Sequence, residues 1–377
     1  MNQVEAYAGF GRGGIKRALY LWVRWRPKRI LQFAQRIQII KRAAKRRMRI
    51  FEEDNILIPP LIILSATMEC NLDCTGCYSR NYSLDEEMSI EELDELFTEA
   101  ENLGVAFFVI TGGEPLMKEG LLDLMMKHQN LIFLLFTNGT YVTQEIVKQI
   151  QRTCHIIPML SVEGDEAWTD QRRGKDVYSQ VMTAMARLKQ AKVFFGFSTV
   201  VTTRNLSLIQ KGEYYDHLID KGCGLGLLVG YIPQKGSDND PLLISRNQQK
   251  ELRSYILQYQ KTKPLLLMQM PDDEYAQTGV CMAAGRGFVH ITAQGFVEPC
   301  PFSHYATHSY KKSSLKTCFD STYFKHIRNL PNLKNIPHRG CALLEIEDKL
   351  LEQTKHLGVR STEMKILADT ESVVSED

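Results

Sequence analysis

The sequence predicts an α/β fold in which helices cover a parallel sheet, flanked by a basic segment and a cysteine-containing segment. The first observation is that strand and helix patterns alternate through about six βα units between residues 60 and 235. The second is that loops rich in Gly, Cys or acidic residues follow four of the strands. Because the carboxyl ends of parallel strands share one edge, where such folds carry their chemistry, we expect one functional site there.

The individual elements follow from hydrophobic periodicity and from turn residues. The first helix after the cysteines is expected to begin at a capping box of Ser89 and Glu92 and to end at Gly104. Expected strands cover residues 61–65, 105–111, 131–136, 156–160, 193–201 and 225–231. Expected helices cover residues 89–102, 120–128, 144–152, 178–190, 206–221 and 245–260. We expect four units: an arm (1–54), a core (55–240), a small α+β domain (241–350) and a polar tail (351–377).

Composition is that of a soluble globular protein, with an uneven distribution of charge. Of the 377 residues, 44% are apolar and 24% are charged. Residues 1–50 hold fourteen Lys or Arg against one acid, whereas 43 acids outnumber 32 bases in the remainder. We find no secretory signal, and the longest uncharged apolar run, 56–64, is too short to span a membrane. We therefore expect a cytoplasmic protein whose clustered cysteines bind metal rather than form disulfides.

Three cysteines lie within eight positions, directly after the first expected strand. Cys70, Cys74 and Cys77 have the spacing C-x3-C-x2-C. Three closely spaced thiolates on one loop can hold three irons of a [4Fe–4S] cluster and leave the fourth iron open for substrate chemistry. The alternative is a zinc site with one remote ligand.

Other loops at the same edge extend this pattern. Gly112, Gly113, Glu114 and Pro115 follow the second strand, and Ser161, Val162 and Glu163 follow the fourth, with the stretch 170–174 beyond. In this combination, residues 60–235 resemble the radical S-adenosylmethionine (radical SAM) superfamily. The resemblance implies a partial (βα)6 TIM-like barrel. It also implies reductive cleavage of SAM at the cluster, a 5′-deoxyadenosyl radical that abstracts hydrogen from a substrate, and an electron donor such as flavodoxin or ferredoxin.

The resemblance also implies which residues contact SAM. Glycine backbone would approach the ligand closely, Glu114 would accept from the methionyl ammonium, and Arg173 would donate to the methionyl carboxylate. Structural alternatives are a helix cap for Glu114, a strand end for Ser161 and a surface cation for Arg173. Gly76 stands where many members carry an aromatic residue near the adenine. The full set of candidates is Gly112, Gly113, Glu114, Ser161 and Glu163 (for the ribose hydroxyls), Arg173, and Tyr78 as a replacement adenine contact; no catalytic acid or base is assigned.

A second set of cysteines lies beyond the expected barrel. The stretch from Cys281 to Cys300 resembles the auxiliary-cluster extension known as SPASM or twitch, and an expected hairpin at 288–299 brings these two cysteines together. We expect Cys281, Cys300 and Cys341 to hold one auxiliary [4Fe–4S] cluster, with Cys318 either the fourth ligand or a core residue. The alternative is a zinc-stapled or metal-free cap. The remaining thiols, Cys154 and Cys223, read as small buried hydrophobes.

The basic arm reads as an amphipathic helix over residues 29–51, with Trp22 and Trp25 before it. Residues 15–51 would suit contact with an anionic membrane surface, which would make the protein peripheral at the membrane. A helix packed on the barrel is the alternative. A nucleic-acid arm is disfavoured because no RNA-binding module accompanies it.

Three functions remain open from the sequence. The first is a radical SAM enzyme acting on a lipid or other membrane-associated substrate. The second is a radical SAM maturase that modifies a peptide or protein, since the auxiliary extension is common among such enzymes. The third is an iron–sulfur or zinc binding protein that does not cleave SAM.

Overall fold

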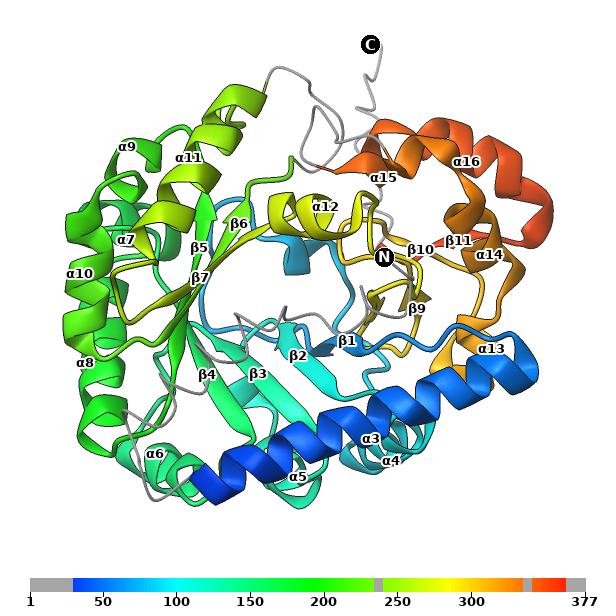
Figure 1. Ribbon diagram of the computed structural model, residues 1–377, viewed down its shortest axis with the longest axis horizontal. Helices are drawn as coiled ribbons and strands as arrows, with labels where there is room; N and C mark the ends of the chain where they lie inside the picture. Colours follow the sequence, from blue (N-terminus) through cyan, green and yellow to red (C-terminus); the bar gives the residue numbers. More distant parts are fainter. Residues whose placement is uncertain (1–29, 234–239, 335–340, 364–377) are drawn as a thin grey trace, which may run out of the picture.

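A nine-stranded sheet forms the centre of the computed structural model, which describes residues 30–233, 240–334 and 341–363 (Figure 1). Strands β1 to β8 pair in parallel, and only β9 runs antiparallel to its neighbour. In sheet order the strands are β7 (Leu266–Met270), β6 (Leu225–Gly230), β5 (Gly196–Val201), β4 (Ile156–Ser161), β3 (Ile132–Thr137), β2 (Phe107–Gly112), β1 (Leu61–Thr67), β8 (Phe288–Ile291) and β9 (Val297–Glu298). The expected parallel α/β fold is confirmed.

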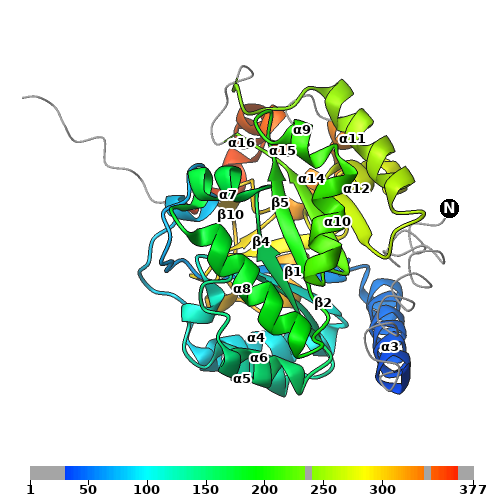
Figure 2. The ribbon, with the colours of Figure 1, turned by 90° about the vertical axis from the view of Figure 1, so that its left-hand side faces the viewer.

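Helices cover the outer side of the curved sheet (Figures 1 and 2). The predicted capping box is present, because the Ser89 hydroxyl accepts from the Glu92 amide and the Glu92 carboxylate accepts from the Ser89 amide. Gly104 ends that helix in the left-handed conformation, with φ of 87°. The helices are α4 (Ile90–Leu103), α5 (Leu121–Lys127), α6 (Gln144–Gln151), α7 (Glu166–Arg173), α8 (Val177–Gln190), α9 (Leu206–Ile209), α10 (Gly212–Lys221) and α11 (Arg246–Tyr259).

The sheet extends past the strands expected from sequence. Strand β7 pairs with β6 through Leu225 to Val229, and β8 pairs with β1 from Leu61 to Leu64. The expected boundary at residue 240 therefore divides a continuous sheet, since β7 and β8 come from the segment assigned to the C-terminal domain. Strand β7 is only five residues long, which gives periodicity too little length to reveal it. Strand β8 was expected in the hairpin at 288–299, but its pairing with β1 was not.

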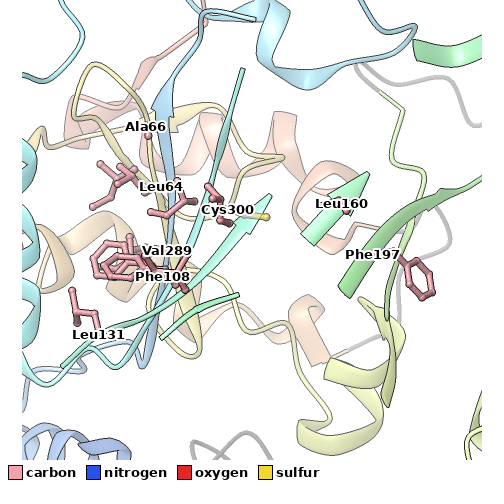
Figure 3. Packing of buried hydrophobic residues seen from close by; sticks show 14 of the residues in the cluster. Leu64, Ala66, Phe108, Leu131, Leu160, Phe197, Val289 and Cys300 are labelled. Atoms are coloured by element: carbon pink, nitrogen blue, oxygen red, sulfur yellow. The ribbon is translucent and has the colours of Figure 1, made fainter. Parts of the chain in front are cut away.

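The core lies between the sheet and its helices. Alternate residues of the strands point outward, and Ile62, Leu64, Phe108 and Ile110 are fully buried there. Figure 3 shows Leu64, Phe108 and Val289 meeting in this layer. Burying each such side chain contributes roughly 1.5–3 kcal/mol. This packing holds the strands in place, so the loops that follow them at the carboxyl edge begin at well-defined positions.

Helix α3 (Ile30–Asp54) packs on the barrel through its arginines. Arg46 donates to the Glu101 carbonyl at 2.8 Å, and Arg47 donates to the Gly104 carbonyl, both at the end of α4. Arg36 donates to the Gln129 carbonyl after α5. These contacts support the packed structural helix among the alternatives left open by sequence. Trp22 and Trp25 lie outside the described residues, and no described helix meets the length and hydropathy needed to cross a bilayer.

The C-terminal segment adds a hairpin and short helices beside β1. Gly295, with φ of 84°, turns the chain between β8 and β9, as the sequence predicted. Strands β10 (Tyr305–Ala306) and β11 (Arg360–Ser361) form a separate two-stranded sheet. The helices are α12 (Asp272–Thr278), α13 (Leu315–Phe319), α14 (Thr322–Asn329), α15 (Ala342–Glu345) and α16 (Glu347–Thr354); the tail beyond residue 363 lies outside the described residues.

We predict that Arg47→Ala lowers the free energy of unfolding by about 1–3 kcal/mol, because the Gly104 carbonyl loses its buried donor. Arg49→Ala on the same helix is the matched control, since Arg49 is exposed and pairs only with the exposed Glu53 among the described residues. Urea unfolding measures both. Equal effects of the two substitutions would contradict the packing role of Arg47.

Candidate active site

The cysteine loop begins where β1 ends and lies at the carboxyl edge of the sheet. Cys70 is exposed, Cys77 half-buried and Cys74 buried. The Thr75 amide donates to the Arg172 carbonyl at 3.0 Å, which fixes the loop to α7. Burial raises the pKa of the Cys70 and Cys74 thiols, and the neighbouring cysteines add to the rise. The three thiols are thus close enough to influence one another.

Arginine charges offset part of this effect at Cys74. Arg173 and Arg172 both act to lower the pKa of its thiol. Thiolates are the form that ligates metal, so cations beside the loop favour cluster binding. In the described residues, no three Cys, His, Asp or Glu side chains are already gathered at ligand distance around one point. The donor set fits an iron–sulfur cluster by its chemistry and its position on one loop.

Gly112 and Gly113, at the end of β2, allow their backbone to lie directly against the backbone of residues 67–69. A Cβ on Gly112 would lie 2.1 Å from the Thr67 oxygen, and a Cβ on Gly113 would lie 2.0 Å from the Glu69 oxygen. The Gly113 amide donates to Thr67 and the Glu114 amide donates to Glu69. The close approach that the glycines permit in this structure is therefore to the cysteine loop itself.

Glu114 is completely buried and fully engaged by the protein. One oxygen accepts from the Thr137 hydroxyl at 2.8 Å and the Leu116 amide at 3.1 Å. The other accepts from the Asn138 amide at 2.7 Å. Burial raises the pKa of the carboxyl, although these hydrogen bonds oppose the rise. Glu114 joins the ends of β2 and β3, which matches the capping alternative.

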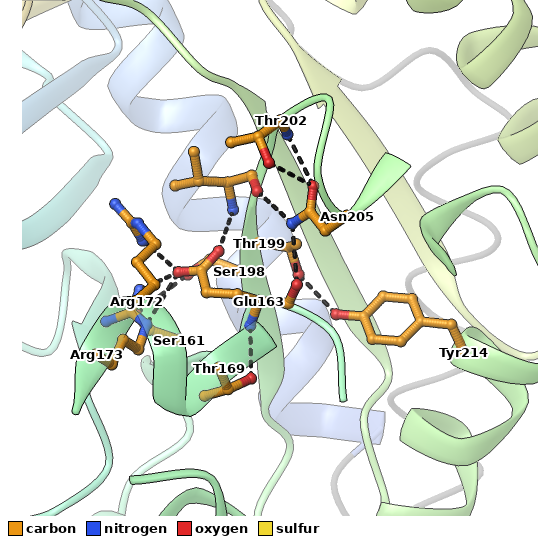
Figure 4. Close-up of polar contacts among 11 residues, drawn as sticks. Ser161, Glu163, Thr169, Arg172, Arg173, Ser198, Thr199, Thr202, Asn205 and Tyr214 are labelled. Atoms are coloured by element: carbon orange, nitrogen blue, oxygen red, sulfur yellow. Dashed lines mark hydrogen bonds and ion pairs between the residues drawn. The ribbon is translucent and has the colours of Figure 1, made fainter. Parts of the chain in front are cut away.

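Glu163 is the centre of a buried polar cluster (Figure 4). Arg173 donates to one carboxylate oxygen at 2.6 and 2.9 Å, and Arg172 donates to the same oxygen. The Val200 amide donates to the other oxygen at 2.9 Å. Burial acts to raise the pKa of Glu163, but the two guanidinium groups outweigh it and the pKa is lowered. In this structure Glu163 holds two arginines rather than presenting a free carboxylate.

The remaining SAM candidates differ in how open they are. The hydroxyl of Ser161, half-buried at the end of β4, lies 3.4 Å from the hydroxyl of Ser198 within β5. Tyr78 directly follows the cysteine loop. Its hydroxyl lies 3.3 Å from the Ser65 hydroxyl and 3.2 Å from the Thr111 hydroxyl. Ser161 therefore remains accessible at the edge, whereas the Tyr78 hydroxyl is tied to β1 and β2.

An aromatic ring lies beside Gly76 that sequence reasoning did not identify. A Cβ on Gly76 would be 3.7 Å from the ring of Tyr231, the residue after β6. The Tyr231 hydroxyl donates to Asp240 at 2.9 Å, and burial together with Asp240 raises its pKa to about 12. The available signal was an aromatic residue at the carboxyl end of a predicted strand. Arg172 was also missed, although it directly precedes Arg173.

Of the four cysteines in the second set, the structure groups Cys281, Cys300 and Cys341 but not Cys318. Cys281, Cys300 and Cys341 are 7–9% exposed. Burial raises the pKa of each thiol; Cys341 adds to the rise at Cys281 and Cys300, and Cys281 adds to the rise at Cys300. Cys318 is fully buried on α13, where its sulfur faces the Ser313 carbonyl and its pKa responds to Glu99. The structure therefore places Cys318 with α4 rather than with the other three. Cys223 is buried beside Met185, as expected of a core thiol, and Cys154 is half-buried.

A buried network joins the barrel to the hairpin and was not predicted. The Ser65 hydroxyl lies 2.8 Å from Nε2 of His290, whose Nδ1 lies 2.5 Å from Glu298. The Tyr82 hydroxyl donates to both Glu298 oxygens at 3.1 and 3.2 Å. Directly bonded members of the network are up to 225 positions apart, so no local spacing could indicate it.

Comparison with known proteins identifies the family. The family model described as "Radical SAM superfamily" matches residues 64–211, which include the cysteine loop, Glu114 and the Glu163 cluster. Residues 64–211 are therefore a radical SAM domain. This match does not specify the reaction of the protein. Radical SAM proteins bind SAM and a [4Fe–4S] cluster and need an electron donor.

Similar proteins span several radical SAM activities. The AdoMet-dependent heme synthase of Methanosarcina barkeri is 22% identical over 73% of this chain and 86% of that protein. The mycofactocin maturase MftC of Mycolicibacterium smegmatis is 27% identical over 53% of this chain and 52% of that protein. For several curated relatives the match covers only 38–59% of the relative's own length.

A solved structure shows the same fold over most of the chain. Streptococcus suis SuiB, crystallised with its precursor peptide SuiA, superposes with a TM-score of 0.65 at 17% identity. The superposition covers 81% of this chain and 76% of SuiB. It therefore extends well beyond the 148 positions of the family match.

We predict that Glu163→Gln lowers the free energy of unfolding by about 3–5 kcal/mol at pH 7, because two arginines lose a buried carboxylate. The lowered pKa of Glu163 means that this contribution is present above the unfolded-state pKa, near 4.3, and disappears as pH falls through the folded-state pKa. Urea unfolding at several pH values measures it. A difference between wild type and variant that does not shrink in acid would contradict the ion-pair account.

Proposed function

We propose that this protein cleaves SAM reductively and removes a hydrogen atom from a peptide or protein side chain. The observation that carries the proposal is the cysteine loop, joined to a pair of half-buried arginines at the carboxyl edge of a parallel sheet. When bound, the cluster and SAM supply the one-electron cleavage and the hydrogen abstraction. The protein's own residues bind, orient and exclude water.

Cys70, Cys74 and Cys77 would hold the SAM-binding cluster. Arg173 is the donor suited to the methionyl carboxylate, because Glu163 fixes its guanidinium and its charge reaches Cys74. Ser161 is the accessible hydroxyl for the ribose. Tyr231, beside Gly76, is the aromatic ring best placed to contact the adenine. Glu114 and Glu163 would act mainly by positioning the loops, since their oxygens already have protein partners.

The peptide substrate class is favoured by two kinds of similarity. SuiB was crystallised with a precursor peptide, and MftC is named as a maturase. The structural superposition on SuiB covers 81% of the chain, which is more than the radical SAM domain at residues 64–211. A tetrapyrrole is the second candidate, because the match to the heme synthase covers the larger share of the chain.

We also propose an auxiliary cluster at Cys281, Cys300 and Cys341. The surroundings of these cysteines support it: burial raises the pKa of the Tyr275 hydroxyl, Cys281 and Cys341 add to the rise, and the hydroxyl hydrogen-bonds to Cys281. Tyr275 and the cysteines therefore belong to one buried region. Cys318 would not be a ligand.

We predict about eight irons per chain in anaerobically reconstituted wild type, and 5′-deoxyadenosine formation with dithionite and SAM. Changing Cys70, Cys74 and Cys77 to Ala should abolish 5′-deoxyadenosine and leave about four irons. The matched control changes Cys281, Cys300 and Cys341 to Ala, and should leave about four irons with SAM cleavage retained. Wild type that forms no 5′-deoxyadenosine would refute the enzyme proposal, and deuterated peptides and tetrapyrroles would then show which class delivers deuterium to this product.

We further propose that α3 contacts an anionic membrane surface through its outward side. Met48 is 39% and Phe51 is 43% exposed, next to the exposed bases Lys45 and Arg49. Apolar side chains flanked by cations are typical of interfacial helices.

Liposome flotation tests this contact. We predict that wild type floats with vesicles containing anionic phosphatidylserine and not with neutral vesicles, and that Met48→Ser with Phe51→Ser reduces flotation several-fold. Leu257→Ser on α11, an exposed apolar side chain remote from α3, is the control. Flotation that is equal for all three proteins, or absent for wild type, would remove the membrane proposal.

A further inference from the structure

A hydrogen-bonded chain joins the residue after the cysteine loop to the C-terminal hairpin. The hydroxyl of Tyr78, one position beyond Cys77, lies 3.3 Å from the Ser65 hydroxyl, which lies 2.8 Å from Nε2 of His290. Nδ1 of His290 lies 2.5 Å from Oε2 of Glu298. Ser65, His290 and Glu298 are all 0% exposed. The chain is therefore a continuous buried path of exchangeable protons that ends next to a predicted cluster ligand.

This chain lies on the inner side of the barrel. In the register of the sheet, Ser65 pairs with Thr111 of β2, and His290 pairs with Ile63. Ile63 and Ser65 alternate along β1 with Leu64, which is buried in the outer layer under the helices. The imidazole of His290 is thus placed towards the interior of the barrel and not in the outer hydrophobic layer.

Glu298 is a buried acid that no arginine or lysine neutralises in the described part of the chain. The Tyr82 hydroxyl donates to both carboxylate oxygens, at 3.1 and 3.2 Å, and the Thr362 hydroxyl donates to Oε1. His290 is the residue that forms an ion pair with Glu298 when it is protonated. Because a buried carboxylate without a cation is costly, the surroundings of His290 favour a proton on its ring.

Both protonation states of His290 fit the same hydrogen bonds. With a proton on Nδ1 alone, Nε2 accepts from Ser65, and Ser65 accepts from Tyr78. With a second proton, Nε2 donates to Ser65, Ser65 donates to Tyr78, and the Tyr78 hydroxyl donates to Thr111 at 3.2 Å. Protonation therefore reverses the direction of the chain while the heavy atoms keep their positions.

Four further titratable groups belong to the same network. The rings of Tyr78 and Tyr82 lie edge-on to His290, with centroids 6.4 and 6.2 Å away. The Tyr82 hydroxyl also contacts Nδ1 of His304, whose Nε2 lies 3.7 Å from Glu363. The side chains of His304 and Glu363 are 13% and 14% exposed. Protons can thus reach the network from solvent at this end.

We propose that His290 takes up a proton when the cluster at Cys70, Cys74 and Cys77 is reduced. This inference rests on the proposed SAM-cleaving function and deepens it. As one electron enters the cluster from its donor, one proton moves from solvent to Nε2 of His290. When that electron breaks the sulfur–carbon bond of SAM, the proton returns to solvent. A negative charge added near Tyr78 favours the imidazolium, because charges interact strongly where water is excluded.

The test measures the midpoint potential of this cluster against pH. Full-length protein carrying Cys281→Ser, Cys300→Ser and Cys341→Ser is titrated between about pH 6 and 9, with electron paramagnetic resonance as the readout. We expect the potential to fall as pH rises, by up to about 59 mV per pH unit, because one proton per electron makes each unit a tenfold change. His290→Gln, whose amide forms hydrogen bonds but takes up no proton, should abolish this slope. A potential that is independent of pH without the His290 substitution would overturn the proposal by itself.

Two variants serve as controls. His155→Gln replaces an imidazole that is 3% exposed and bonds to the Met125 carbonyl outside the network. His304→Gln replaces the second imidazole of the network. Both should keep the pH-dependent potential.

The remaining outcomes separate this proposal from the function on which it rests. A slope that persists in His290→Gln, or that is lost in His304→Gln alone, would assign the proton to another group and overturn the role of His290. A protein that binds no iron would refute the cluster. A reduced protein that forms no 5′-deoxyadenosine from SAM would refute the proposed function.

Discussion

The ion pair between Glu163 and the two arginines of α7 is the interaction on which the site depends. A carboxylate at 2% exposure is stable only with compensating charge, and Arg172 and Arg173 supply it. The same carboxylate accepts from the backbone of β5, and the Arg172 carbonyl accepts from the cysteine loop. One charge cluster thus fixes β4, β5, α7 and the loop relative to one another, and it brings positive charge towards Cys74.

A second constraint is steric and lies between two loops. Gly112 and Gly113 leave no room for a side chain because the backbone of residues 67–69 passes within about 2 Å of where a Cβ would stand. The Gly-Gly-Glu stretch therefore aligns the cysteine loop on one side, while Glu114 secures β3 on the other. In this structure Gly112, Gly113 and Glu114 contact the neighbouring loops; their predicted contacts with SAM stay a prediction.

The sequence predicted the features that are local. Repeated βα order, the capping box at Ser89, the turn at Gly295 and the spacing of Cys70, Cys74 and Cys77 each depend on residues close together in the chain. It could not predict contacts between distant segments, such as Tyr231 beside Gly76 or His290 with Ser65. The short strand β7 and the pairing of β8 with β1 were missed for a related reason, because they are set by neighbouring strands rather than by the few residues of each strand.

The most direct test of the account concerns the open iron at the cysteine loop. Protein carrying Cys281→Ser, Cys300→Ser and Cys341→Ser holds a single cluster, which can be reduced and mixed with SAM labelled with ¹⁵N in the methionyl amine and ¹⁷O in the carboxylate. Electron–nuclear double resonance would then report whether these atoms bind the cluster. The account predicts hyperfine coupling from both labels, lost when Cys70, Cys74 and Cys77 are also replaced. A reduced cluster that shows no coupling to either label in the presence of saturating SAM would contradict it.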